Sequence, residues 1–175
     1  GQIPPMSPEG ALASAASAAG RDARRAGRGP SDSYEHRGLY DRCITRGLPG
    51  SMMPANYGNS YRIVQGPGLV AITYEMVHET RVVPLDGRPR LSPSIRQHMG
   101  DARGRWEGDT LVVETTNLVD GYRGADPEAI RYIERFTPIS AAQIEWSFTV
   151  DDPSTWMRPW TFAMPLTRND DEAIF

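Results

Sequence analysis

Residues 104–117 read GRWEGDTLVVETTN, a stretch that predicts a tight β-hairpin. The pair Gly108-Asp109 suits a two-residue turn, because glycine tolerates positive φ and aspartate hydrogen-bonds to nearby backbone. The flanking residues 104–107 and 110–117 then form two antiparallel strands. We therefore interpret Trp106 and the glycines beside it as structural residues.

Alternating segments continue on both sides of this hairpin. We expect further strands over residues 61–65, 69–83, 130–137, 143–150 and 156–166. The 17 glycines and 15 prolines lie between these segments, as the reversals of an antiparallel protein require. The connections are short and no helix of about 10–15 residues intervenes, which argues against a parallel βαβ sheet. The sequence predicts a mainly β protein: a small antiparallel up-and-down barrel, or a strongly curved, half-open sheet capped by an N-terminal helix.

The N-terminal region has a different pattern. Ser7, Pro8 and Glu9 have the residue types that begin a helix, and residues 11–26 are rich in alanine. Such a helix buries little surface, so it is marginal on its own in water. We assign residues 1–30 to a helical arm or tail, which is either solvated or a clasp on a partner chain.

Residues 31–175 form a single β domain in this interpretation. A capping pattern predicts a short helix over residues 33–46, and Ser92-Pro93 predicts a brief second helix ending at Gly100. Residues 173–175 resemble the beginning of a strand, which predicts a domain truncated at its C-terminus.

Composition excludes several function classes. All 19 basic residues are arginine, so a Schiff-base lysine, a pyridoxal phosphate anchor and a Walker-type phosphate loop are excluded, and we expect no cofactor. Cys43 is the single cysteine, and His36, His78 and His98 show no metal-ligand spacing. The net charge of −3 argues against nucleic-acid binding, and no apolar run reaches the ~18–20 residues of a membrane span.

Three blocks in the chain resemble an uncharacterised family of exported acidobacterial and proteobacterial proteins. They are CITRGLPG at residues 43–50, GRWEGDTLVVETTN at 104–117 and DPSTWMRPW at 152–160. The resemblance implies a periplasmic or secreted protein and carries no assigned activity. It also implies that Cys43 could pair with a cysteine beyond Phe175. The strand pattern is similar to calycin-type barrels, which bind small apolar ligands.

A period of two places three ionisable side chains, His78, Glu134 and Arg158, on the concave face among aromatic rings. Burial raises the pKa of an unpaired carboxylate and lowers that of a histidine, so His78 and Glu134 are candidate catalytic bases. Arg158 could stack on a flanking tryptophan and hold an anion. The ligand-binding candidates are Tyr74, Tyr132, Trp146, Trp156, Arg158 and Trp160. The alternative is a Glu134–Arg158 ion pair that needs no substrate.

A second charged cluster precedes the hairpin. It consists of Arg96, His98, Asp101, Arg103 and Arg105. Three arginines at a barrel mouth could recognise an anion, but a solvated loop with weak surface ion pairs is the alternative that we favour.

Three functions are compatible with these features. The first, which we favour, is an exported small-molecule-binding β-barrel with an aromatic-lined pocket for a small apolar or anionic ligand. The second is a cofactor-independent lyase or isomerase that uses His78 or Glu134 as its base. The third is an accessory or interaction subunit of a larger envelope assembly, attached through residues 7–29 or the C-terminal edge. A filled interior with a Glu134–Arg158 ion pair favours the third, whereas an empty aromatic-lined cavity favours one of the first two.

Overall fold

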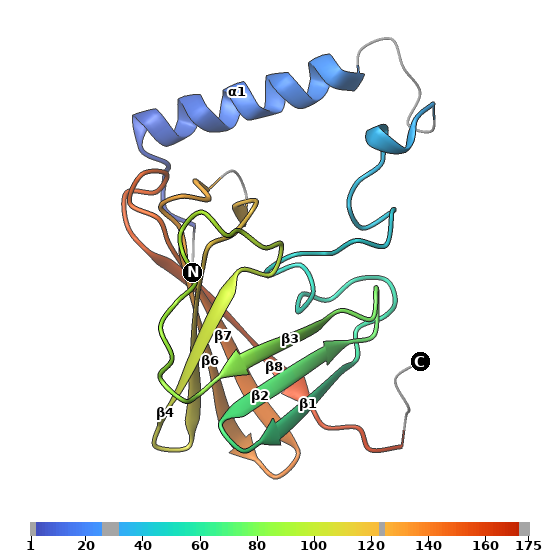
Figure 1. Cartoon of the computed structure of the whole chain (residues 1–175), viewed down its shortest axis with the longest axis vertical. Coiled ribbons are helices and arrows are strands. Elements are labelled where there is room, and N and C mark those ends of the chain that lie inside the picture. Colours follow the sequence, from blue (N-terminus) through green and yellow to red (C-terminus); the bar gives the residue numbers. More distant parts are fainter. Residues whose placement is uncertain (1–2, 26–31, 123–124, 172–175) are drawn as a thin grey trace.

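The computed structural model describes residues 3–25, 32–122 and 125–171. Within these residues the chain forms one α-helix, α1 (Pro8–Arg25), one 3₁₀ turn, η1 (Tyr34–His36), and eight strands. The strands are β1 (Tyr61–Gly66), β2 (Leu69–Tyr74), β3 (Thr80–Pro84), β4 (Asp101–Glu107), β5 (Thr110–Thr116), β6 (Arg131–Ser140), β7 (Gln143–Asp151) and β8 (Trp160–Thr167). They build a β body, and α1 lies across one end of it (Figure 1).

The strands form two antiparallel sheets in chain order, β1-β2-β3 and β4-β5-β6-β7-β8. The mainly β, up-and-down architecture is therefore confirmed. A closed barrel is not formed within the described residues, because β3 does not pair with β4, and β1 and β8 are edges. The predictions for residues 26–30 and 173–175 fall outside the described residues.

The β4–β5 hairpin forms where the sequence predicts it. Glu107 pairs with Thr110, and Gly108 adopts the positive φ of 60° that the turn requires. Val112 and Val113 of β5 are both fully buried, so this strand lies inside the molecule. Each such buried aliphatic side chain contributes about 1.5–3 kcal/mol of burial free energy.

The predicted single strand over residues 69–83 is wrong. The chain reverses after Tyr74, through a turn in which Val77 and His78 have positive φ values of 68° and 55°. This turn shifts the alternation by one residue, so the period of two that places His78 on the concave face does not continue into β3, where Arg81 is buried and Val82 is exposed.

The predicted helix over residues 33–46 is also wrong, because only η1 forms, capped by the Ser33 side chain. Residues 37–60 continue as turns and loop, and this loop inserts Met52 into the core with no exposed surface. The Tyr61 hydroxyl donates to the Met52 carbonyl (2.7 Å) and holds the loop against β1. The brief helix predicted near residues 92–100 is replaced by turns.

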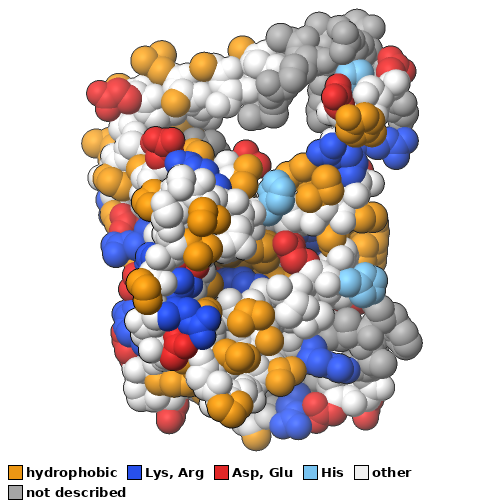
Figure 2. All heavy atoms as spheres, in the orientation of Figure 1, with side chains coloured by type: hydrophobic (Ala, Val, Ile, Leu, Met, Phe, Trp, Pro, Cys, Tyr) orange, Lys and Arg blue, Asp and Glu red, His pale blue; other side chains and the backbone are white. Residues whose placement is uncertain are grey.

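Helix α1 begins at the predicted position. The Ser7 hydroxyl accepts a hydrogen bond from the Gly10 backbone N–H (2.9 Å), and the Ser7 backbone N–H donates to the Thr155 carbonyl (2.9 Å). Beyond this first turn the helix is mostly exposed, and Leu12 is 72 % exposed. Open space separates α1 from part of the β body (Figure 2). None of the described helices has the length and apolar character of a membrane-spanning helix.

Candidate functional site

The aromatic residues predicted to line a pocket instead fill the core. These side chains, each at most 8 % exposed, are Tyr74, Tyr132, Trp146, Trp156 and Trp160. The Tyr132 and Trp146 rings both pack on Phe148, with centroid separations of 4.8 Å and 5.5 Å. The Trp156 and Trp160 rings pack on each other at 5.6 Å, and the Tyr74 ring packs on Tyr61 at 6.2 Å. The concave face is therefore a packed aromatic core in the described part of the chain.

Glu134 lies at the centre of this core and is ion-paired with Arg81. Its second carboxylate oxygen accepts a hydrogen bond from Trp146 Nε1 (3.1 Å), while Arg81 Nη2 also donates to the Thr115 hydroxyl (3.0 Å). Burial works to lower the pKa of Arg81, but the Glu134 carboxylate outweighs burial, so the pKa is raised. Burial also raises the pKa of the neighbouring Tyr74 to about 12. The ion pair is inaccessible to solvent, because the side chains of Arg81 and Glu134 are 2 % and 0 % exposed.

The partner predicted for Glu134 was wrong. Arg158 is exposed, because residues 152–159 form a turn rather than the first part of β8. Trp156 and Trp160 contact each other directly, and Arg158 is not between them. His78 is exposed in the β2–β3 turn, so the structure does not bring His78, Glu134 and Arg158 together. Their predicted catalytic and ligand-binding roles stay predictions.

The charged loop cluster is largely neutralised by carboxylates. Arg103 Nη1 pairs with Asp101 (2.5 Å), and Arg105 pairs with Glu107 (2.8 Å) and Glu114 (2.7 Å). Arg96 pairs with Glu128 (3.0 Å) beside a pocket of about 380 Å³. His98 is the member of the cluster that faces a different pocket, at the end of the body nearest α1.

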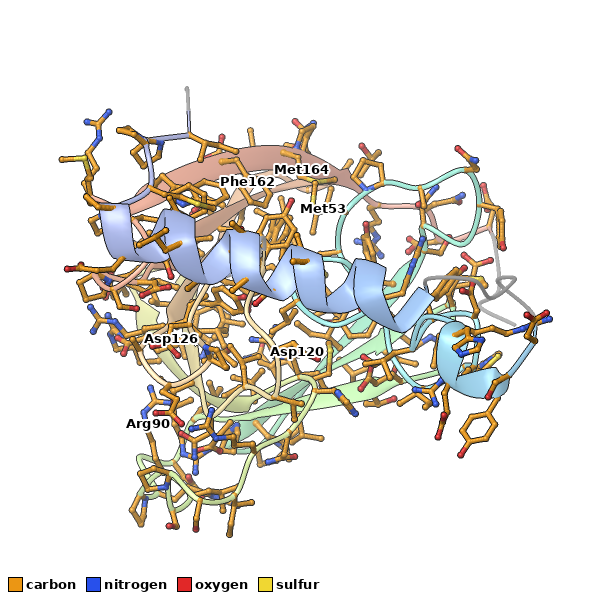
Figure 3. All side chains as sticks on the ribbon, turned by 90° about the horizontal axis from the view of Figure 1, so that it is seen from above. Met53, Arg90, Asp120, Asp126, Phe162 and Met164 are labelled. Atoms are coloured by element: carbon orange, nitrogen blue, oxygen red, sulfur yellow. The ribbon has the colours of Figure 1, made fainter. Side chains whose placement is uncertain are left out.

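This second pocket, which we call the end pocket, has a volume of about 620 Å³ and is open to solvent. Its walls come from two loops, residues 38–55 on one side and residues 120–122 on the other. Both Met53 and Asp120 line this pocket, and in the view from above their labels lie on either side of the α1 ribbon (Figure 3). The volume lies within the roughly 300–1,000 Å³ range of small-molecule sites.

The two loops that form the end pocket are tied to the core. The Tyr122 backbone N–H donates to the buried Tyr132 hydroxyl (2.7 Å), and the Tyr122 ring lies 6.3 Å from that of Trp160. On the opposite wall, the Thr45 hydroxyl donates to a Glu79 carboxylate oxygen (2.7 Å). These contacts hold both walls of the pocket in place.

Arg46 supplies a positive charge to this pocket. Its guanidinium lies over the Tyr40 ring, 4.7 Å from the centroid, and Nη1 donates to the Gly58 carbonyl (3.4 Å). Sequence reasoning missed this site, because no regular element spans residues 38–55 and periodicity cannot orient side chains there. The available signal was the block at residues 43–50, in which five of eight residues line the pocket: Thr45, Arg46, Gly47, Leu48 and Gly50.

The described residues contain no group of three or more side chains placed to hold a metal ion. No protein-family model, curated protein or solved structure matches this chain. The resemblance to an exported bacterial family therefore stays a prediction from the sequence blocks.

Proposed function

We propose that this protein binds a small molecule in the end pocket, and that it does so in the periplasm or outside the cell. The observation that supports the proposal is the pocket itself: about 620 Å³ with aromatic, apolar and charged lining groups. The proposal retains the favoured function from the sequence but moves the site from the concave face to the α1 end.

Native mass spectrometry of the full chain, purified from its own host, tests this proposal. We expect a retained small molecule as a non-covalent adduct. Ala55→Trp should abolish the adduct by filling the pocket, since Ala55 is exposed on its lining. The matched control is Ala141→Trp, an exposed position in the β6–β7 turn. The proposal would be contradicted if the unmodified protein carried no adduct, or if the Ala55→Trp variant retained it.

A second function, an interaction subunit, is supported by two observations. The interior is filled and Glu134 is paired, and α1 contacts the β body chiefly through its first turn. An assembly formed through α1 should lose its partner when the exposed Leu12 is replaced by glutamate. Retention of a native complex by Leu12→Glu would exclude attachment through this face of the helix.

The lyase or isomerase alternative rests on His78 and Glu134. Glu134 is completely buried beside Arg81, whereas His78 lies in an exposed turn. No observed geometry favours this function over the other two.

A further inference from the structure

We propose that Arg46 binds an oxyanion, a carboxylate or a phosphate, on a ligand whose apolar body occupies the end pocket. This inference rests on the proposed function and adds the chemical class of the ligand. It assigns a role to the CITRGLPG block, which contributes both Arg46 and a large share of the pocket lining.

The first argument is the charge balance of the arginines. Many arginine side chains already pair with a carboxylate within 4 Å: Arg81, Arg88, Arg90, Arg96, Arg103, Arg105, Arg131, Arg135 and Arg168. Arg46 makes no such pair with any carboxylate in the described part of the chain. Its positive charge therefore remains uncompensated at the wall of an open pocket.

The second argument is the geometry of the guanidinium. Stacking on Tyr40 restrains its plane, so less conformational entropy is lost when a ligand binds. The hydrogen bond to Gly58 uses one of its five N–H groups. The others can form the paired, charge-assisted hydrogen bonds that a carboxylate or phosphate accepts.

The third argument is the remaining lining of the pocket. Leu39, Leu48 and Met53 offer apolar surface, and the Tyr122 ring adds an aromatic wall. Besides Arg46 and the two tyrosines, the ionisable side chains that line the pocket are His98 and Asp120. A ligand with one anionic end and an apolar body matches this combination, and Asp120 disfavours a second negative charge near its own side.

Isothermal titration with three matched probes tests the inference: octanoate, octyl phosphate and octanol, which share an apolar chain. We expect at least one anionic probe to bind at least about tenfold more tightly than octanol, because a charge-assisted hydrogen bond adds to the apolar contact. The anion that binds more tightly distinguishes carboxylate from phosphate recognition. Arg46→Gln should remove the preference, so that the anionic probes bind no more tightly than octanol does. Arg62→Gln is the control, because Arg62 is exposed on β1 and outside the pocket.

The failures of the two proposals are distinguishable. Equal affinity of all three probes for the unmodified chain, with all binding lost in Ala55→Trp, overturns the oxyanion inference and leaves the pocket proposal standing. An anion preference that survives in folded Arg46→Gln also overturns the inference. If no probe binds and the protein purified from its own host carries no adduct in native mass spectrometry, both the pocket proposal and the oxyanion inference are overturned. The probe comparison on the unmodified chain decides the question even where Arg46→Gln does not fold.

Discussion

Arg81 and Arg46 are the same type of residue in two contrasting regions of the molecule. Arg81 is buried in the aromatic core, where Glu134 compensates its charge and Thr115 accepts another hydrogen bond. Arg46 lies at the open α1 end, stacked on Tyr40 and without a carboxylate partner among the described residues. The contrast teaches that a charged side chain close to aromatic rings does not by itself indicate a ligand site. Arg46 differs from Arg81 in two properties: it is accessible from solvent, and no carboxylate among the described residues compensates its charge.

The largest effect is expected from Arg81→Met, which leaves Glu134 buried without its cation. We predict a loss of about 3–5 kcal/mol in the free energy of unfolding, measured by urea denaturation. The double variant Arg81→Met/Glu134→Leu should recover much of this loss, because it removes the unpaired charge. A loss below about 1 kcal/mol for the single variant would show that the core does not depend on the ion pair.

Asp152, a buried carboxylate that has no ion-pair partner within residues 3–25, 32–122 and 125–171, extends the comparison. Asp152 is 1 % exposed, and its carboxylate accepts hydrogen bonds from the backbone N–H groups of Asp126 (2.8 Å), Ser154 (3.0 Å) and Thr155 (3.1 Å). Burial works to raise the pKa of Asp152, but hydrogen bonds from Thr155 and Ser154 outweigh it, so the pKa is lowered. The folded state therefore stabilises the ionised Asp152 carboxylate more than the unfolded state does.

This stabilisation is present above the unfolded value of about 3.9 and is lost as the pH falls through the lower folded pKa. We predict that Asp152→Asn costs about 1–3 kcal/mol at pH 7 and weakens the decline in stability on acidification. Urea denaturation between pH 7 and pH 3 measures both effects. Asp109→Asn, in the exposed β4–β5 turn, is the control. If the stability of Asp152→Asn falls as steeply between pH 7 and pH 3 as that of the unmodified protein, other carboxylates cause the decline.

A third prediction concerns whether α1 can loosen independently of the core. A Cβ at Gly10 would lie 2.4 Å from the Thr155 carbonyl oxygen, which is backbone and cannot move aside freely, whereas a Cβ at Gly20 meets nothing within 4 Å. Gly10→Ala should accelerate hydrogen exchange of the α1 amides by about tenfold. Gly20→Ala should slow it several-fold, since alanine favours helix by about 0.8–1.0 kcal/mol over glycine. Equal effects of the two substitutions would show that the contact with Thr155 does not anchor the helix.

The smallest stability effect is expected from Arg46→Gln. Loss of the stacking on Tyr40 should cost about 0.5–1 kcal/mol, equivalent to a decrease of no more than about 4 °C in Tm. Thermal denaturation followed by circular dichroism measures it. A loss as large as that of Arg81→Met would make Arg46 a structural residue and remove the contrast between the two arginines.

Local patterns were sufficient for most of the strands. The β4–β5 hairpin formed as predicted, because Gly108-Asp109 encodes its turn and the flanking residues alternate. The β2–β3 turn could not be predicted in the same way. Val77 and His78 adopt positive φ there, a conformation that sequence rules reserve for glycine and asparagine.

That missed turn accounts for two of the errors in the predicted site, whereas the error at Arg158 comes from the turn at residues 152–159. The β2–β3 turn reversed the alternation in β3 and so hid Arg81, the actual partner of Glu134. It also placed His78 in solvent rather than in the core. The end pocket was missed for a different reason: its walls are irregular loops, and their approach depends on contacts between distant residues such as Tyr122 and Tyr132.

The sequence by itself determined the class of fold, the start of α1 at Ser7 and the inward direction of the aromatic strand residues, because each follows from spacing between neighbours in the chain. Only the tertiary structure decided which arginine neutralises Glu134 and which one faces an open pocket. Those two outcomes depend on the register of strands and on the packing of loops, in which residues far apart in sequence compete for the same buried partners.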